Sequence, residues 1–256
     1  MVKRPFWVFF VLVSLAFAPA RAQLIAVPLP DSSSQPTQTF LWKAKEARAV
    51  LIHIPGGEGV VGLTPNKPGL ETFRSKILTP LSDPSMTSGS ISAVLFDSPY
   101  PMARTSAYPA SRASPDHLRR IESVVAFYKE RFGKPVWLMG HSNGSISVAE
   151  FIHTRSSVLG GAIFAGSRKE LKVSPATALP ILFLHHKHDA CVDTDYRSAR
   201  SAFDAVKSSR MTNVAFVTLE GGSSLPGNEC HTGGYHSFFG DEASAYRAID
   251  EFIGTN

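Results

Sequence analysis

The sequence predicts one α/β domain built on a doubly wound, mostly parallel sheet. Apolar runs with the length of buried strands alternate with helix-compatible segments from Ala49 to the C-terminus. This alternation is typical of strand–helix–strand units. One apolar run, Val136–Met139, leads into Gly140-His141-Ser142-Asn143-Gly144 and then into a helix-compatible segment. The 256 residues are enough for one such domain with its own core.

The first 22 residues have the features of an export signal. Lys3 and Arg4 form a basic segment, Phe6–Ala18 forms an apolar one, and Ala20-Arg21-Ala22 is a small-x-small cleavage site. The apolar segment is shorter than the roughly 20 residues of a membrane-spanning helix. We expect cleavage after Ala22, a mature domain over residues 23–256 without an integral membrane segment, and a periplasmic or secreted location. An uncleaved N-terminal anchor is the alternative.

The basic balance of the chain comes mostly from this segment. The formal net charge is +5, and three of the 26 basic residues (Lys3, Arg4 and Arg21) lie in a segment without acids. Their removal leaves 23 basic against 21 acidic residues, a nearly balanced surface. No like-charge run or basic–aromatic pattern follows, so we expect no nucleic-acid partner.

The expected strands are apolar runs of four to seven residues bounded by turn residues. In chain order they are a short strand within Leu24–Leu29, then Thr39–Lys43, Ala49–Ile54, Ile91–Phe96, Val136–Met139, Leu159–Ala165, Ile181–His186 and Val214–Leu219. Thr39–Lys43 and Ala49–Ile54 flank a polar Lys45-Glu46 turn, which favours an antiparallel pair. The segments 59–89 and 97–114 carry few signals beyond one expected helix, Leu70–Leu81.

The remaining helices have clearer boundaries. Ser114 can cap a helix that begins at Pro115 and stops at Gly133. Its apolar residues fall on one face at helical spacing: Leu118, Ile121, Val124, Val125 and Tyr128. Further helices are expected at Ser142–His153, at Thr194–Ser208 and, capped by Asp241, at Asp241–Ile253.

Ser142 is the candidate nucleophile. Gly-x-Ser-x-Gly between a buried strand and a helix is the pattern of a nucleophile elbow, where a strained turn exposes the serine hydroxyl. A Cβ at Gly140 or Gly144 would collide where strand and helix approach closely. A plain turn serine is the alternative.

An acid and a histidine follow at suitable places. Asp189 lies just beyond the strand Ile181–His186, where an open α/β sheet places reactive groups. His236 lies between the last strand and the last helix, directly before Phe-Phe-Gly. Asp193 and Asp195 are alternatives to Asp189 as the acid, although Asp195 suits the first turn of the next helix. His231 competes with His236.

Other types of site are less well supported. His185, His186 and His188 could suggest a metal, but strand alternation sends His185 and His186 to opposite faces. Gly56-Gly57-Glu58-Gly59 lacks the third glycine and the later acid of a dinucleotide fingerprint. We therefore expect no metal and no cofactor.

From Ala49 to Ile253 the chain resembles the α/β-hydrolases, and more narrowly small exported bacterial members without a cap domain. The resemblance rests on Gly140–Gly144, on His-His-Lys-His-Asp-Ala-Cys at 185–191, and on the segment from Cys230 to His236-Ser-Phe-Phe-Gly. The order Ser142, Asp189, His236 is the order of the nucleophile, acid and histidine in this fold. The resemblance implies hydrolysis but not a substrate.

This chemistry assigns roles to particular groups. His236 would take the Ser142 proton and Asp189 would orient the imidazole. The Asn143 N–H and a second N–H from Gly56-Gly57-Glu58, supplied by Gly57 or Glu58, would bind the oxyanion. We expect a monomeric serine esterase that acts on a small-molecule ester. A peptidase or amidase with the same triad, and an inactive binding protein, are the alternatives.

Cys191 and Cys230 are expected to form a disulfide. One follows the proposed acid by two residues and the other precedes the proposed base by six. An acid and a base that share a hydrogen bond bring their loops together, and an oxidising compartment favours pairing.

Overall fold

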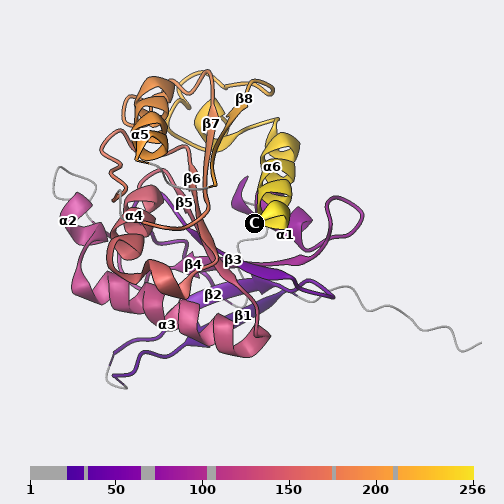
Figure 1. The fold of residues 1–256 in the computed structure, drawn as a ribbon, viewed down its shortest axis with the longest axis vertical. Coiled ribbons are helices and arrows are strands. Elements are labelled where there is room, and N and C mark those ends of the chain that lie inside the picture. The colour runs from indigo at the N-terminus through magenta and orange to yellow at the C-terminus, as the bar shows by residue number, and fades with distance from the viewer. Residues whose placement is uncertain (1–21, 32–33, 65–72, 103–107, 175–176, 210–212) are drawn as a thin grey trace, which may run out of the picture.

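Strands occupy the middle of the molecule and helices cover both of their faces (Figure 1). The computed structural model describes residues 22–31, 34–64, 73–102, 108–174, 177–209 and 213–256. Within these residues, eight strands form one sheet in the order β1-β2-β4-β3-β5-β6-β7-β8. The predicted α/β class is confirmed. Most of the expected export signal, residues 1–21, and the start of the expected Leu70–Leu81 helix lie outside the described residues.

The sheet is parallel from β4 to β8 and antiparallel at its β1–β2 edge. The strands are β1 (Gln23–Val27), β2 (Thr37–Trp42), β3 (Ala49–Ile54), β4 (Ile91–Asp97), β5 (Val136–His141), β6 (Gly161–Ala165), β7 (Ile181–His186) and β8 (Val214–Leu219). Strands β3 to β7 are buried throughout, as their continuous apolar sequences require of a covered parallel sheet.

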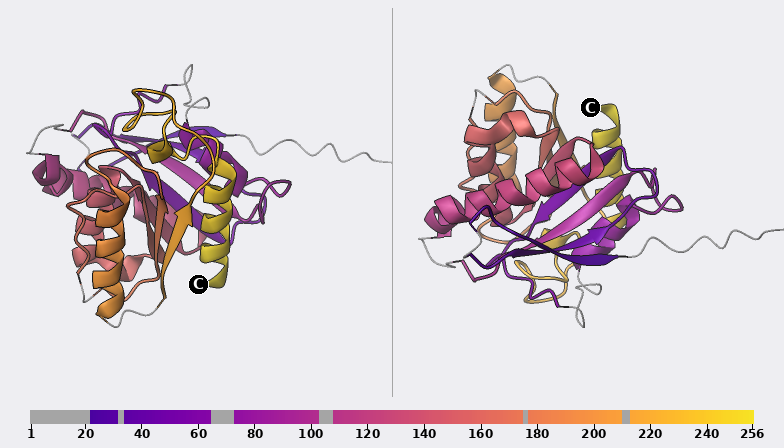
Figure 2. Two further views of the ribbon diagram at one scale, coloured as in Figure 1. Left: turned by 90° about the horizontal axis from the view of Figure 1, so that it is seen from above. Right: turned by 90° about the horizontal axis from the view of Figure 1, so that it is seen from below.

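Two helical layers provide that cover. The α-helices are α1 (Phe73–Leu81), α2 (Tyr108–Arg112), α3 (Pro115–Phe132), α4 (Gly144–Arg155), α5 (Tyr196–Ser208) and α6 (Glu242–Thr255), and the 3-10 turns are η1 (Ser156–Val158) and η2 (Tyr235–Ser237). Helices α3, α4 and α5 pack on one face and α1 and α6 on the other (Figure 2). No helix of the described residues has the length and apolar character needed to cross a bilayer.

The predicted helix boundaries are mostly confirmed. The Ser114 side chain accepts a hydrogen bond from the His117 N–H, and Gly133 ends α3 in the left-handed conformation. Asp195 is the N-cap of α5 and accepts from the Ser198 N–H. Asp241 stands at the N-cap of α6, but its carboxylate accepts from the Gly221 N–H and makes no cap bond to its own helix.

The expected antiparallel pairing of β2 with β3 is wrong. Strand β4 lies between them, antiparallel to β2 and parallel to β3. The β2–β3 connection crosses the start of β4, where Arg48 N–H donates to Ser90 O and Ala44 N–H to Ser92 Oγ. β4 is buried over its whole length, so its backbone groups need partners on both sides. A turn between two neighbouring segments gives no sign of this insertion.

The parallel strands end at one edge of the sheet, and the connection from β8 to α6 passes over that edge (Figure 2). Ser142 follows β5, Asp189 lies three residues beyond β7, and His236 lies in η2 within that connection. The fold therefore brings together side chains that are far apart in the sequence.

Candidate active site

The strand, tight turn and helix expected around Ser142 are present. Ser142 has a φ of 54°, a left-handed conformation that costs a non-glycine residue roughly 1–2 kcal/mol. A Cβ at Gly140 would lie 2.3 Å from Gly144 O, and one at Gly144 would lie 2.1 Å from Ile54 O. These contacts explain why glycine occupies both positions.

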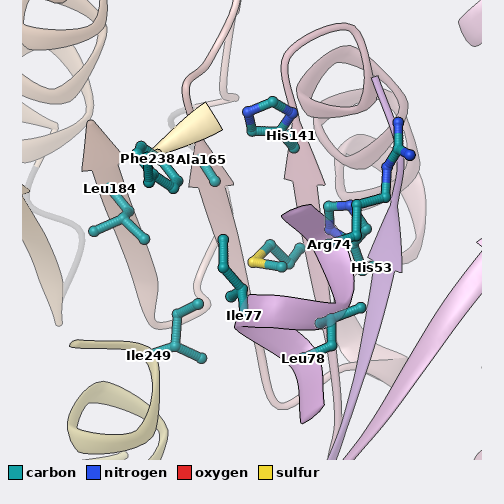
Figure 3. Close-up of a pocket in the computed structure, with 10 residues that line it drawn as sticks. His53, Arg74, Ile77, Leu78, His141, Ala165, Leu184, Phe238 and Ile249 are labelled. Atoms are coloured by element: carbon teal, nitrogen blue, oxygen red, sulfur yellow. The ribbon is translucent and has the colours of Figure 1, made fainter. Parts of the chain in front are cut away.

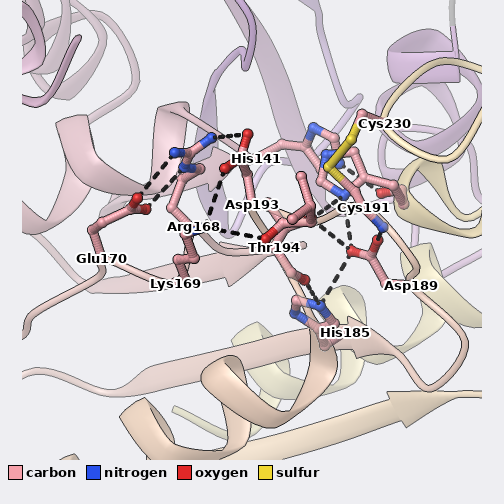
Figure 4. The surroundings of a disulfide bond; sticks show 12 residues. His141, Arg168, Lys169, Glu170, His185, Asp189, Cys191, Asp193, Thr194 and Cys230 are labelled. Carbon is pink, nitrogen blue, oxygen red and sulfur yellow. Dashed lines mark hydrogen bonds and ion pairs between the residues drawn. A yellow bond between two sulfur atoms is a disulfide. The ribbon is translucent and has the colours of Figure 1, made fainter. Parts of the chain in front are cut away.

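The predicted acid and base are in contact. His236 Nδ1 lies 2.9 Å from Asp189 Oδ2, and both residues are buried. Asp193 instead pairs with Arg168 at 3.0 Å (Figure 4). His231 is exposed. Among the residues proposed for these roles, Asp189 and His236 form the pair.

Asp189 is held by more donors than the sequence predicted. Its Oδ1 accepts from the Cys191 N–H at 3.0 Å. Its Oδ2 accepts from Thr194 Oγ1 at 3.0 Å and lies 3.2 Å from His185 Nε2. Burial alone would raise the pKa of the Asp189 carboxyl, but hydrogen bonds from His185 and His236 outweigh it and hold the pKa well below its usual range. Asp189 is therefore ionised at neutral pH.

Thr194 and His185 were not predicted as site residues. Thr194 Oγ1 lies 3.0 Å from both Asp189 Oδ2 and His236 Nδ1. His185 Nε2 also lies 2.7 Å from Thr194 O. The one signal for His185 was its position in β7, four residues before Asp189. Thr194 lies in a turn after Asp189 and had no local signal.

Asn143 and the loop after β3 border the Ser142 hydroxyl. Asn143 Nδ2 donates to Gly57 O at 2.9 Å. A Cβ at Gly56 would lie 2.7 Å from Ser142 Cβ. A cleft of about 200 Å³ is lined by Gly56, Gly57, Ser142 and His236, among others. These positions are compatible with oxyanion donors from Asn143 and from Gly57 or Glu58, which remain predictions.

Three further side chains, those of His53, Arg74 and His141, line an inner cavity (Figure 3), and those of Arg74 and His141 also line the cleft. His141 Nε2 lies 2.9 Å from His236 O, and burial, followed by the His236 charge, brings the pKa of His141 well below its usual value. Neutral His141 therefore donates to the backbone of the proposed base. Burial, and then the charge of Arg74, lower the pKa of His53 to about 3. These residues border an inner cavity of about 10 Å³, which has room for about one water molecule.

His185 and His186 point to opposite faces, as predicted. His186 Nε2 contacts Gly221 O at 2.7 Å, whereas His185 Nε2 contacts Thr194 O. Within the part of the chain that the structure describes, no group of three or more His, Cys, Asp or Glu side chains is arranged to hold a metal ion.

The expected disulfide is present. Cys191 and Cys230 are bonded, with a Cα–Cα distance of 4.7 Å. The bond joins the loop that carries Asp189 to the connection that carries His236 (Figure 4). Cys191 is buried, and Cys230 lines the cleft.

Comparison with known proteins identifies the fold through structure alone. No protein-family model matches the sequence, and no curated protein matches it. Solved structures that are similar over most of their length include the following three. An α/β serine hydrolase without a lid from Xanthomonas campestris has 11% identity and a TM-score of 0.62, covering 93% of this chain and 96% of its own. A dienelactone hydrolase from Anabaena variabilis has 12% identity and a TM-score of 0.62, and the match covers 93% of this chain and 99% of the dienelactone hydrolase.

The third is Est1E from Butyrivibrio proteoclasticus with bound ferulic acid, at 14% identity and a TM-score of 0.62, covering 90% of this chain and 98% of its own. Identities this low show the fold and leave the reaction open. The chain has the α/β-hydrolase fold.

Proposed function

We propose that the protein is a serine hydrolase that cleaves small carboxylic esters through an acyl-enzyme. The observation that carries the proposal is the buried contact of His236 with Asp189 at 2.9 Å, beside a cleft that both His236 and the strained Ser142 line. The names of similar structures, which include two esterases and a dienelactone hydrolase, support ester substrates.

Each residue has a defined part in the proposed reaction. His236 Nε2 removes the Ser142 proton as Oγ attacks the ester carbonyl, and it then returns that proton to the leaving alcohol. Asp189, kept ionised by its donors, orients the ring through Nδ1–H and stabilises the imidazolium. The Asn143 N–H, with an N–H of Gly57 or Glu58, binds the oxyanion. A water activated by His236 then hydrolyses the acyl-enzyme.

Within the described residues, no hydrogen bond joins Ser142 Oγ to His236 Nε2. A catalytic contact of this kind is often long without substrate and tightens in the complex. Ester binding would bring these two atoms into hydrogen-bond distance.

The cleft suits short, water-soluble esters. Its residues come from the end of β5, from loops, from η2 and from the first turn of α1, and no separate cap domain lies among the described residues. We therefore propose no interfacial activation, so the rate should not rise sharply above the solubility limit of a triglyceride. The disulfide supports export from the cytoplasm. The intact mass of the exported protein should correspond to a chain that begins at Gln23, and a mass that includes Met1 would contradict this proposal.

The test is hydrolysis of p-nitrophenyl acetate by the wild type and by Ser142→Ala. The variant should lose on the order of 10³-fold or more in kcat while keeping its melting temperature. Ser157→Ala, an exposed serine of η1, is the control and should be unchanged. More than a tenth of wild-type activity in Ser142→Ala would rule out this nucleophile. Turnover of the matched anilide at the ester rate would favour an amidase instead.

A further inference from the structure

Arg112 has the largest fully buried side chain of the described residues, with 0% exposure. It ends α2, in the segment that carried few sequence signals. An arginine is almost never fully buried unless its charge and its donors are matched by partners. Its contacts therefore indicate what the residue does.

The guanidinium connects the loop Pro55–Gly59 to the helix that follows Ser142. Arg112 Nη1 donates to Pro55 O at 3.0 Å and Nη2 donates to Gly57 O at 2.9 Å. Nη1 also donates to Ser147 Oγ of α4 at 3.1 Å. The planar guanidinium can hold several acceptors in one fixed arrangement, which a lysine ammonium does not reproduce.

These bonds fix the peptide planes of the Pro55–Gly59 loop. In a trans peptide the N–H points away from the preceding carbonyl. Arg112 thereby sets the direction of the Gly56 N–H and of the Glu58 N–H. The peptide between Gly56 and Gly57 is set by the turn bond from Gly59 N–H to Gly56 O, at 3.1 Å. Three successive planes beside Ser142 are thus held in one geometry.

The far side of the guanidinium is fixed as well. Ser147 Oγ accepts from Arg112 and lies 2.9 Å from His117 Nε2. Burial, and then the Arg112 charge, lower the pKa of His117 to about 3, so the ring is neutral and shares one hydrogen bond with the Ser147 hydroxyl. Arg112 is therefore held between α3, α4 and the loop.

We propose that Arg112 is a positioning residue that holds the Pro55–Gly59 loop in the geometry that binds the oxyanion. This inference rests on the proposed function. Arg112 does not touch the substrate; it acts through the loop amides, which must already point at the oxyanion when charge develops. Its loss should therefore lower kcat while KM changes little, because the ground-state ester gains less from these amides than the transition state does.

The experiment compares Arg112→Gln, Arg112→Lys and Arg112→Ala with the wild type on p-nitrophenyl acetate. We expect Arg112→Gln to lower kcat on the order of 10²-fold, the loss typical of one oxyanion donor. Arg112→Lys should recover only part of it. Guanidinium ion, added far below denaturing concentration, should restore activity to Arg112→Ala, because it can occupy the vacated site. Hydrogen exchange of the loop amides should be faster in Arg112→Gln, a readout independent of turnover.

Two controls separate positioning from general stability. Arg119→Gln changes a nearby arginine of α3 that is 60% exposed, and it should leave kcat and loop exchange unchanged. Ser147→Ala removes the α4 contact but keeps both loop contacts, so its effect should be smaller than that of Arg112→Gln. A normal kcat in a folded Arg112→Gln would overturn the inference. So would an equal loss in Ser147→Ala, or an Arg112→Ala that is folded but not rescued. An inactive wild type would instead refute the proposed function.

Discussion

Removal of the Cys191–Cys230 bond should reduce both stability and activity. The cysteines are 39 residues apart in the sequence. A loop of this length gives a chain-entropy stabilisation of about 4 kcal/mol. For a chain of this size that corresponds to a fall in melting temperature of about 8–16 °C.

The effect on activity follows from what the two cysteines hold. The Cys191 N–H donates to Asp189 Oδ1 at 3.0 Å, and Cys230 lies six residues before His236 in the same connection. Without the bond the acid and base loops can move apart. A misplacement of about 1 Å in such a site can cost on the order of 100-fold in rate.

The assay measures melting temperature and kcat/KM for Cys191→Ser with Cys230→Ser, and for wild type treated with dithiothreitol. The two routes should agree. Val192→Ser, at a neighbouring residue that is 73% exposed, is the control and should match the wild type. Alkylation of the denatured, unreduced wild type should label no thiols. Two labelled thiols would refute the bond, and an unchanged melting temperature and rate in the double variant would refute its role.

Three further predictions concern the acid and the base. The lowered pKa of Asp189 means that its ionised form stabilises the fold fully above the unfolded pKa of about 4, and that this contribution is lost as pH falls through the lower folded pKa. The free energy of unfolding in urea should therefore be higher for the wild type than for Asp189→Asn, by an amount that is constant from about pH 5 to 8 and decreases below about pH 4. A difference in free energy that is still of the same size at pH 3 would contradict this prediction. Thr194→Val should lower kcat by about 10-fold or more, since the hydroxyl donates to a charged carboxylate, and Thr194→Ser should restore the rate. His236→Ala should lose as much activity as Ser142→Ala, whereas His231→Ala should change kcat little. A large loss in His231→Ala with little change in His236→Ala would assign the role of the base to His231.

Local signals in the sequence predicted much of the architecture. The glycines around Ser142 are required by close contacts within one strand–turn–helix unit, so a short motif carries the information. Ser114 and Gly133 are likewise recognisable because a helix end is stabilised by residues adjacent to it. Cys191 and Cys230 could be paired because both lie near residues whose contact was itself expected.

Features that depend on distant parts of the chain were not predictable in this way. The position of β4 between β2 and β3 depends on how the whole sheet packs against its helices, and not on the residues next to each strand. Thr194 reaches Asp189 through a turn whose conformation no motif specifies. Arg112 lies in a short helix without a periodic pattern. Two of its acceptors come from a loop more than 50 residues earlier, and Ser147 lies 35 residues later.

The proposed reaction requires that His236 activates Ser142 as a nucleophile. The most direct measurement is reaction of the purified protein with a fluorophosphonate, followed by intact mass and peptide mapping. We expect one adduct per chain, located on Ser142, absent from Ser142→Ala and formed far more slowly in His236→Ala. A folded wild type that forms no adduct, or an adduct on another residue, would contradict it.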